Sequence, residues 1–129
     1  MKNKKLPHNN VYTRLGCSKI HGVGAFAIAD IPKGTNIFGY DDKKPLIVDK
    51  EVAEQQDKEI KKLYNDFCAF RNGKYYCPDS FNNLDVSWYL NESKNPNTKS
   101  NGYEFYALRD IKRGEELTVD YSTFSEELS

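Results

Sequence analysis

The chain has 129 residues, and its 19 Lys and Arg residues are balanced by 19 Asp and Glu residues, so its formal net charge at neutral pH is zero. This length predicts a single domain that can bury its own core, and the charge balance gives no reason to expect direct binding to nucleic acid or to an anionic membrane. The sequence also lacks a run of about 18 apolar residues, which a membrane helix would need.

The N-terminal end is basic and polar. Residues 1–5 (MKNKK) are followed by LPHNN and not by the apolar run of a signal peptide. We therefore expect residues 1–10 to be a flexible end and residues 11–129 to form the single domain. We also expect an intracellular protein, in the cytoplasm or the nucleus.

The three cysteines, Cys17, Cys68 and Cys77, are odd in number and form no C-x-x-C pair. A disulfide framework and a zinc site are therefore not predicted, and His8 and His21 are too few and too isolated to indicate another metal site. We expect free thiols and no metal, with Cys68 in the core. A Cys/His nucleophile pair remains open, although no local signature supports it.

Residues 22–27, GVGAFA, fit the dinucleotide-binding pattern G-x-G-x-x-[GA], and Asp41 and Asp42 lie near the spacing of a ribose-binding acid. That motif must open a helix, whereas here Pro32 and Gly34 follow closely and the residues between alternate like a strand. The glycines instead predict a close approach of the backbone, either to another segment at a bulge or to a ligand.

Two segments near the ends of the chain are similar to each other. FAIADIPKG (26–34) and YALRDIKRG (106–114) align at an offset of 80 and share Ala, Asp, Ile and Gly. Each predicts a β-hairpin: a strand, a tight turn closed by Gly34 or Gly114, and a second strand over 35–38 or 116–121.

The second strand of the C-terminal unit follows a simple alternation. Leu117, Val119 and Tyr121 are expected on its buried face and Thr118 and Asp120 on the other face. In an ordinary edge hairpin, the preceding residues Glu115 and Glu116 would be solvated.

A different type of element is predicted between the two units. Residues 50–71 place apolar side chains at helical spacing, with charged residues forming a solvated face: Ile60, Leu63, Tyr64, Phe67 and Phe70. Asp49 or Asp57 could cap this helix, and Asn72-Gly73 is expected to end it. The next two stretches, KYYCP (74–78) and LDVSWYL (84–90), predict a short strand and a buried element.

The segment YLNESKNPN (89–97) predicts a polar turn, because asparagine side chains can cap their own backbone. Taken in order, however, HGVGAFA, LNESKNPN and GEELTVDY resemble the three motifs of the SET-domain protein-lysine methyltransferases. Those motifs run approximately G-x-G-hydrophobic-Phe, N-H-S-x-x-P-N and G-E-E-[LI]-T-x-D-Y. The resemblance covers about residues 17–124. It implies a mainly β, β-clip-like fold with one helical insert and a C-terminal pseudoknot, in which the LNESKNPN segment threads beneath a loop.

The resemblance also implies S-adenosylmethionine as cofactor. The residues matching the family's cofactor-binding positions are Gly22, Val23, Gly24, Ala25, Asn91, Glu92, Tyr121 and Phe124. Glu92 stands where the family usually has histidine. If only the backbone of this residue serves the cofactor, a carboxylate is tolerated provided it finds a donor or water, and Glu92→His should leave activity equal or improved. If the histidine ring itself is needed, affinity for the cofactor falls.

Tyr121 matches the family's catalytic tyrosine, and Tyr40 in IFGY is the second catalytic candidate. The implied reaction is methylation of a lysine side-chain amine in a protein or peptide, a histone being one candidate. Two alternatives stay open: an inactive SET-like module that only binds a peptide, and a methyltransferase acting on a small molecule. The far wall of the lysine channel would come from Phe124 or from the partner in a homodimer, and Val119 leaves the number of methyl groups undecided.

Overall fold

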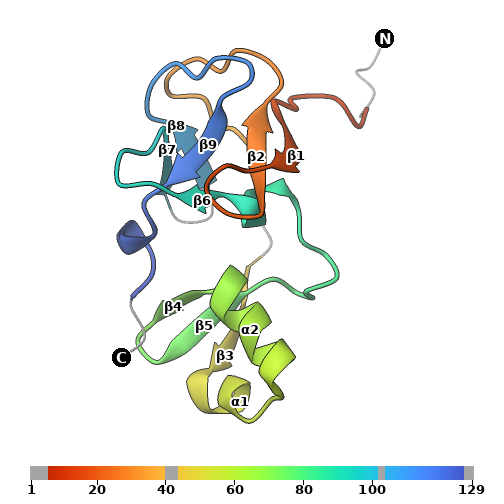
Figure 1. Cartoon of the computed structure of the whole chain (residues 1–129), viewed down its shortest axis with the longest axis vertical. Coiled ribbons are helices and arrows are strands. Elements are labelled where there is room, and N and C mark those ends of the chain that lie inside the picture. Colours follow the sequence, from red (N-terminus) through yellow and green to blue (C-terminus); the bar gives the residue numbers. More distant parts are fainter. Residues whose placement is uncertain (1–5, 40–43, 102–103, 127–129) are drawn as a thin grey trace.

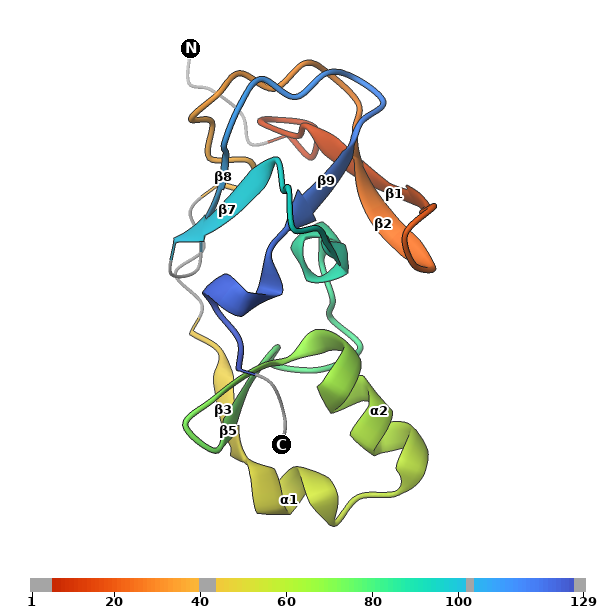
Figure 2. The same cartoon turned by 60° about the vertical axis from the view of Figure 1, so that its left-hand side comes forward.

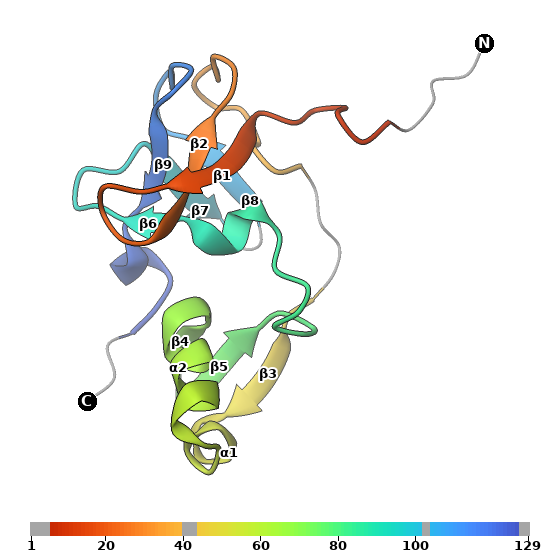
Figure 3. The same ribbon diagram turned by 45° about the vertical axis from the view of Figure 1, so that its right-hand side comes forward.

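The computed structural model describes residues 6–39, 44–101 and 104–126. In these residues strands predominate over helices, as the sequence predicted. They form two layered parts (Figure 1, Figure 3): a strand-rich body built from both ends of the chain, and an insert of one small sheet with two helices.

The strand-rich body contains a sheet in the order β1-β2-β9-β6. Its strands are β1 (Thr13–Cys17), β2 (Val23–Ala27), β9 (Glu116–Val119) and β6 (Asn91–Glu92). β2 lies antiparallel to both β1 and β9, whereas β6 runs parallel to β9. A second, antiparallel pair, β7 (Thr98–Asn101) and β8 (Glu104–Ala107), completes this body. The GVGAFA and LNESKNPN motifs are thereby joined through the last strand.

The two similar segments pair with each other across this body. Ile31 and Ile111 form an antiparallel bridge, in which the N–H of each donates to the carbonyl of the other at 2.7 and 2.8 Å. The aspartate before each isoleucine accepts a hydrogen bond from the backbone N–H two residues after the other isoleucine, at 2.9 and 2.8 Å. The contacts are therefore reciprocal and tie the N-terminal unit to the C-terminal one.

The prediction of two local hairpins is wrong. The Gly34 N–H donates to the carbonyl of Ala107 and the Gly114 N–H to that of Ala27, both at 2.8 Å, so each turn returns onto the other unit. The φ angles of these glycines, 86° and 93°, are rarely adopted by other residues. Pairing of each turn with the other unit buries Ile31 and Ile111 together. This burial of apolar surface favours the observed pairing over two separate hairpins.

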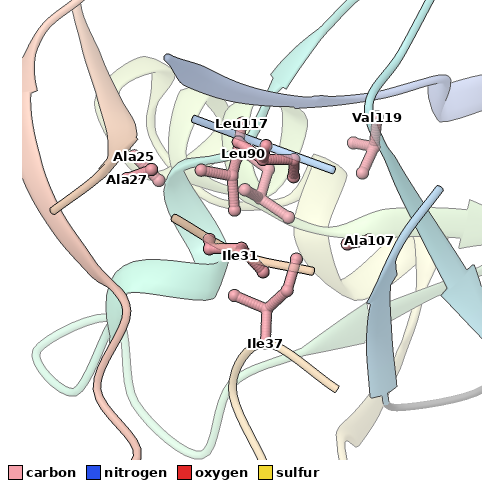
Figure 4. Close-up of a cluster of buried hydrophobic side chains, with 9 residues drawn as sticks. Ala25, Ala27, Ile31, Ile37, Leu90, Ala107, Leu117 and Val119 are labelled. Carbon is pink, nitrogen blue, oxygen red and sulfur yellow. The ribbon is translucent and has the colours of Figure 1, made fainter. Parts of the chain in front are cut away.

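The main core is shared by both ends of the chain (Figure 4). Its buried members are Ala25, Ala27, Ile31, Ile37, Leu90, Ala107, Ile111, Leu117 and Val119. Leu90 contributes to this core from the end of the short 3-10 helix η1 (Val86–Tyr89), which occupies the stretch predicted as a buried element. Packing of Leu90 in the main core therefore fixes the end of the segment that precedes β6.

The insert differs from the single predicted helix over 50–71. It contains α1 (Lys50–Glu54) and α2 (Lys58–Phe67), which lie at an angle to each other and are joined by a turn in Figure 2, and its sheet has the order β3-β5-β4. These strands are β3 (Leu46–Asp49), β5 (Lys74–Cys77) and β4 (Ala69–Arg71), and β5 confirms the strand predicted for KYYCP.

Asn72 and Gly73 do not end the helix as predicted, since α2 already ends at Phe67 and residues 69–71 form β4. Both have positive φ, 54° and 76°, and form the two-residue turn that joins β4 to β5. Asp57 caps α2 by accepting from the Ile60 N–H at 3.0 Å, whereas Asp49 precedes α1 without a side-chain cap. Cys68 terminates α2 and is buried, as predicted. Among the helices of the described residues, none is long and apolar enough to cross a membrane.

We predict that Ile31→Ala lowers the free energy of unfolding by about 2–5 kcal/mol, because it removes a buried side chain from the contact between the two units. Ile28→Ala is the matched control, since Ile28 is 40% exposed and should lose much less. Urea unfolding of both variants measures the difference, and equal losses would contradict the importance of the Ile31–Ile111 contact.

Candidate functional site

A hollow of about 420 Å³ lies between the strand-rich body and the end of α2. It is lined by four parts of the chain: residues 20–23, which end with the first residue of β2, residues 65–67 of α2, residues 88–92 of η1 and β6, and Tyr121. The first, third and fourth parts contain residues predicted from sequence to form the site. The structure therefore brings the three motifs together around one cavity.

Tyr121 lies beyond the end of β9, not on its buried face as predicted. The strand ends at Val119, and Tyr121 begins the 3-10 turn η2 (Tyr121–Thr123), with 36% of its surface exposed. Its hydroxyl donates to the Leu90 carbonyl at 2.6 Å. The ring therefore forms part of the wall of the hollow, and its polar end is held in a fixed place.

Burial raises the pKa of the Tyr121 phenol above its usual value, because a phenolate would lose solvation there. Three nearby carboxylates raise this pKa further through their negative charge. They belong to Glu92, Asp66 and Glu116. The hydroxyl consequently stays protonated throughout the neutral pH range and remains a donor to Leu90.

Asn91 is buried and connects the glycine motif to the last strand. Its side-chain amide nitrogen lies 3.1 Å from the His21 carbonyl, 3.3 Å from the Val23 carbonyl and 2.8 Å from Glu116 Oε2. Through the N–H groups of its side-chain amide, Asn91 thus holds the backbone of residues 21–23, which border the hollow.

In an ordinary edge hairpin Glu116 would be solvated, but here it is half-buried beneath the glycine motif. Its carboxylate accepts hydrogen bonds from Asn91 and from the Ser18 hydroxyl, the latter at 2.8 Å. A Cβ on Gly24 would fall directly on this carboxylate. The close approach predicted from the glycines is therefore, at Gly24, an approach to Glu116. The period-two alternation of β9 places Glu116 on the same face as Thr118, opposite the face that the sequence predicted to be buried, so local sequence did not identify its burial.

Asn97 satisfies buried backbone groups of β9, as expected for this polar segment. Its Oδ1 accepts from the Thr118 N–H at 2.9 Å, and its Nδ2 donates to the Glu116 carbonyl at 2.8 Å. Residues 91–93 and Asn97 are thus bonded to β9. The threading of this segment beneath a loop stays a prediction.

Glu92 has the donors that its carboxylate requires. Glu92 Oε2 accepts from the backbone N–H of Tyr121 at 3.2 Å and lies 3.6 Å from Lys94 Nζ, which also lies 3.7 Å from Asp120. The side chain at position 92 therefore has its own structural partners, and this position does not act through its backbone alone.

The remaining predicted residues are placed differently. Ala25 is fully buried in the sheet between Leu15 and Leu117, so its side chain does not reach the hollow. Phe124 packs against the core and against the Tyr121 ring at a centroid distance of 5.9 Å, behind the lining residues. Tyr40, the second catalytic candidate, lies outside the described residues.

The insert contributes residues that sequence analysis did not identify as functional. Asp66 and Phe67 at the end of α2 line the hollow, although the charges of this helix were interpreted only as a solvated face. Phe67 packs edge-on against Tyr89 at 5.6 Å between ring centroids, and Trp88 is the third aromatic residue of this wall. Within residues 6–39, 44–101 and 104–126, His, Cys, Asp and Glu side chains do not gather in a group of three that could hold a metal ion.

A model of the SET domain matches residues 22–122, which include residues from all four parts of the hollow. This chain belongs to the SET-domain family. The match runs from the glycine motif to the turn that carries Tyr121, as the three sequence motifs predicted.

This SET domain is similar to several longer proteins. It is 34% identical over 121 residues to "Histone-lysine N-methyltransferase trr" of Drosophila melanogaster, a match covering 88% of this chain and 5% of that protein. It is 31% identical to "Histone-lysine N-methyltransferase 2D" of Homo sapiens, over 88% of this chain and 2% of that protein. It is also 31% identical to "Histone-lysine N-methyltransferase, H3 lysine-4 specific" of Schizosaccharomyces pombe, over 87% of this chain and 13% of that protein. The chain thus spans only a small part of the length of these relatives.

We predict that Gly24→Ala lowers the free energy of unfolding by about 1–3 kcal/mol, because the new Cβ displaces the Glu116 carboxylate and leaves Asn91 without this acceptor. In the double variant with Glu116→Ala the clash with the carboxylate is removed and the Asn91 amide nitrogen, at 3.0 Å, is the remaining close neighbour of the new Cβ, so the two losses should not add in full. A double-mutant cycle by urea unfolding tests this coupling, and strictly additive losses would show that Gly24 and Glu116 do not depend on each other.

Proposed function

We propose that this SET domain transfers a methyl group from S-adenosylmethionine to the side-chain amine of a lysine in a protein. The single observation that carries the proposal is the fixed Tyr121 hydroxyl, bonded to Leu90 at the wall of a hollow that the three family motifs share. A histone is the first candidate substrate, because the relatives described above are named for histone lysine.

The hollow suits this cofactor in size and chemistry. Its volume of about 420 Å³ falls in the usual range of small-molecule sites, about 300–1,000 Å³. Carboxylates of Asp66 and Glu92 favour the cationic sulfonium and ammonium groups, and the rings of Phe67, Trp88 and Tyr89 offer apolar faces for a purine. The backbone of Gly22 and Val23, held in place by Asn91, would border the amino-acid end.

When bound, S-adenosylmethionine supplies an electrophilic methyl group on a positively charged sulfur. The residues of the hollow must orient a lysine amine that has lost its proton, since a free lysine has a pKa of about 10.4. Tyr121 is suited to this orienting role because its own proton is committed to Leu90. Its oxygen can then accept weak C–H···O contacts or an N–H bond in the reacting geometry.

We predict that Tyr121→Phe reduces single-turnover methyl transfer by roughly 10²–10³-fold, the usual cost of losing a well-placed catalytic hydrogen-bonding group. The ring remains, so cofactor affinity and thermal unfolding should change little. Tyr76→Phe is the matched control, because Tyr76 lies in β5 of the insert and does not line the hollow. Labelled methyl donor with a histone mixture gives the rate. A near-parental rate in Tyr121→Phe would remove Tyr121 from the mechanism.

We also predict that the protein binds S-adenosylmethionine in the presence of a metal chelator, because the hollow offers carboxylates, carbonyls and aromatic rings as binding groups. Isothermal titration with and without chelator measures this. Absence of binding in both titrations would favour the alternative of an inactive peptide-binding module. Binding that the chelator abolishes would instead require a metal.

A further inference from the structure

We infer that Glu92 is a positioning residue for Tyr121: the Glu92 carboxylate holds the backbone of this tyrosine while the Leu90 carbonyl holds its hydroxyl. This inference rests on the proposed function in so far as Tyr121 is catalytic. It assigns to Glu92 a role that the family's usual histidine does not provide in the same way.

The two contacts come from neighbouring residues of one short segment. Glu92 Oε2 lies 3.2 Å from the Tyr121 nitrogen, and the Leu90 oxygen lies 2.6 Å from the Tyr121 hydroxyl. Because Leu90 and Glu92 are only two positions apart, one short segment holds the tyrosine at both ends, through the backbone carbonyl of Leu90 and the side-chain carboxylate of Glu92. The hydroxyl bond restrains the ring, and the N–H bond restrains the backbone from which the ring extends.

The short segment that contains Leu90 and Glu92 is itself fixed. Leu90 is buried in the main core, and Glu92 pairs with Val119 in the parallel β6–β9 ladder. The following residue, Ser93, donates its N–H to the Val119 carbonyl at 2.9 Å. Val119 lies just two residues before Tyr121. The paired strands β6 and β9 therefore fix the position of Glu92 relative to the turn that contains Tyr121.

The charges around the turn support the same arrangement. The N–H groups of Tyr121 and Ser122 begin η2 without partners inside the turn, and each meets a carboxylate, Glu92 for the first and Asp120 for the second. Lys94 lies 3.6 Å from Glu92 and 3.7 Å from Asp120 and offsets their mutual repulsion. The negative charge of Glu92 also contributes to keeping the Tyr121 hydroxyl protonated.

A neutral histidine at position 92 could not reproduce both partners. Its ring has one acceptor nitrogen and no negative charge, so it cannot both accept from the Tyr121 N–H and pair with Lys94. The sequence predicted equal or improved activity for Glu92→His only if position 92 serves through its backbone alone. Because the Glu92 carboxylate bonds to Tyr121, we instead expect Glu92→His to lower activity.

The test compares Glu92→Gln, which keeps an acceptor oxygen but loses the charge, with Glu92→Ala, which loses both. Glu59→Ala, an exposed change in the first turn of α2, is the control. Ionisation of Tyr121 is followed by phenolate absorbance, using Tyr121→Phe as the blank, and methyl transfer is measured as separate kcat and KM values.

We expect Glu92→Ala to lower kcat about two- to tenfold, in line with the loss of one hydrogen bond, with a smaller change in the KM for S-adenosylmethionine. Glu92→Gln should recover most of kcat, because its amide oxygen can still accept from Tyr121. Both variants should show a lower Tyr121 pKa than the parent, and Glu59→Ala should match the parent in every readout.

An unchanged Tyr121 titration in both variants would overturn the inference, as would a Glu92→Gln protein as slow as Glu92→Ala. If Glu92→Ala does not fold, the titration of Glu92→Gln still decides, because it needs only the loss of charge. The titration also needs no activity: a parent protein that transfers no methyl group would refute the proposed function, whereas the response of Tyr121 to position 92 would still test its positioning.

Discussion

The reciprocal bridge between Ile31 and Ile111 is the contact on which the rest of the structure depends. It joins the two ends of the chain, and the same crossing sends the second strand of the C-terminal unit alongside β2. With β9 in that position, Glu116 comes to lie under Gly24, and Tyr121 emerges at the border of the hollow. The site is therefore a consequence of pairing between segments 80 residues apart.

The polar segment after η1 is stabilised by β9 and in turn shapes the site. Asn91 and Asn97 each bond to groups on or beside this strand, one holding the glycine motif through Glu116 and the other satisfying the backbone of Thr118. Such buried amides stabilise the fold only when their partners are correctly placed, since an unpaired buried polar group is costly. The same bonds that complete the core thus define the wall of the hollow.

The insert contacts the rest of the site through two elements, the end of α2 and strand β4. The end of α2 supplies Asp66 and Phe67 to the hollow, and the C-terminal residues pair with the edge of β4. There the Glu126 N–H donates to the Phe70 carbonyl at 2.6 Å, and the Phe70 N–H donates to the Ser125 hydroxyl at 2.9 Å. The segment that follows Tyr121 therefore links the strand-rich body to the insert.

The sequence alone determined the family and the mainly β fold with an inserted helical part. It also identified Asn91 and Tyr121 as candidate site residues, because these features depend on short motifs and local periodicity. Only the tertiary structure decided which strands pair, that Phe70 belongs to a strand rather than to the helix, and that Glu116 is buried against Gly24. It also decided that Glu92 bonds to Tyr121 through its side chain. The physical reason is that these outcomes are set by contacts between residues up to 98 positions apart, as for Ser18 and Glu116, and local residue preferences carry no information about such partners.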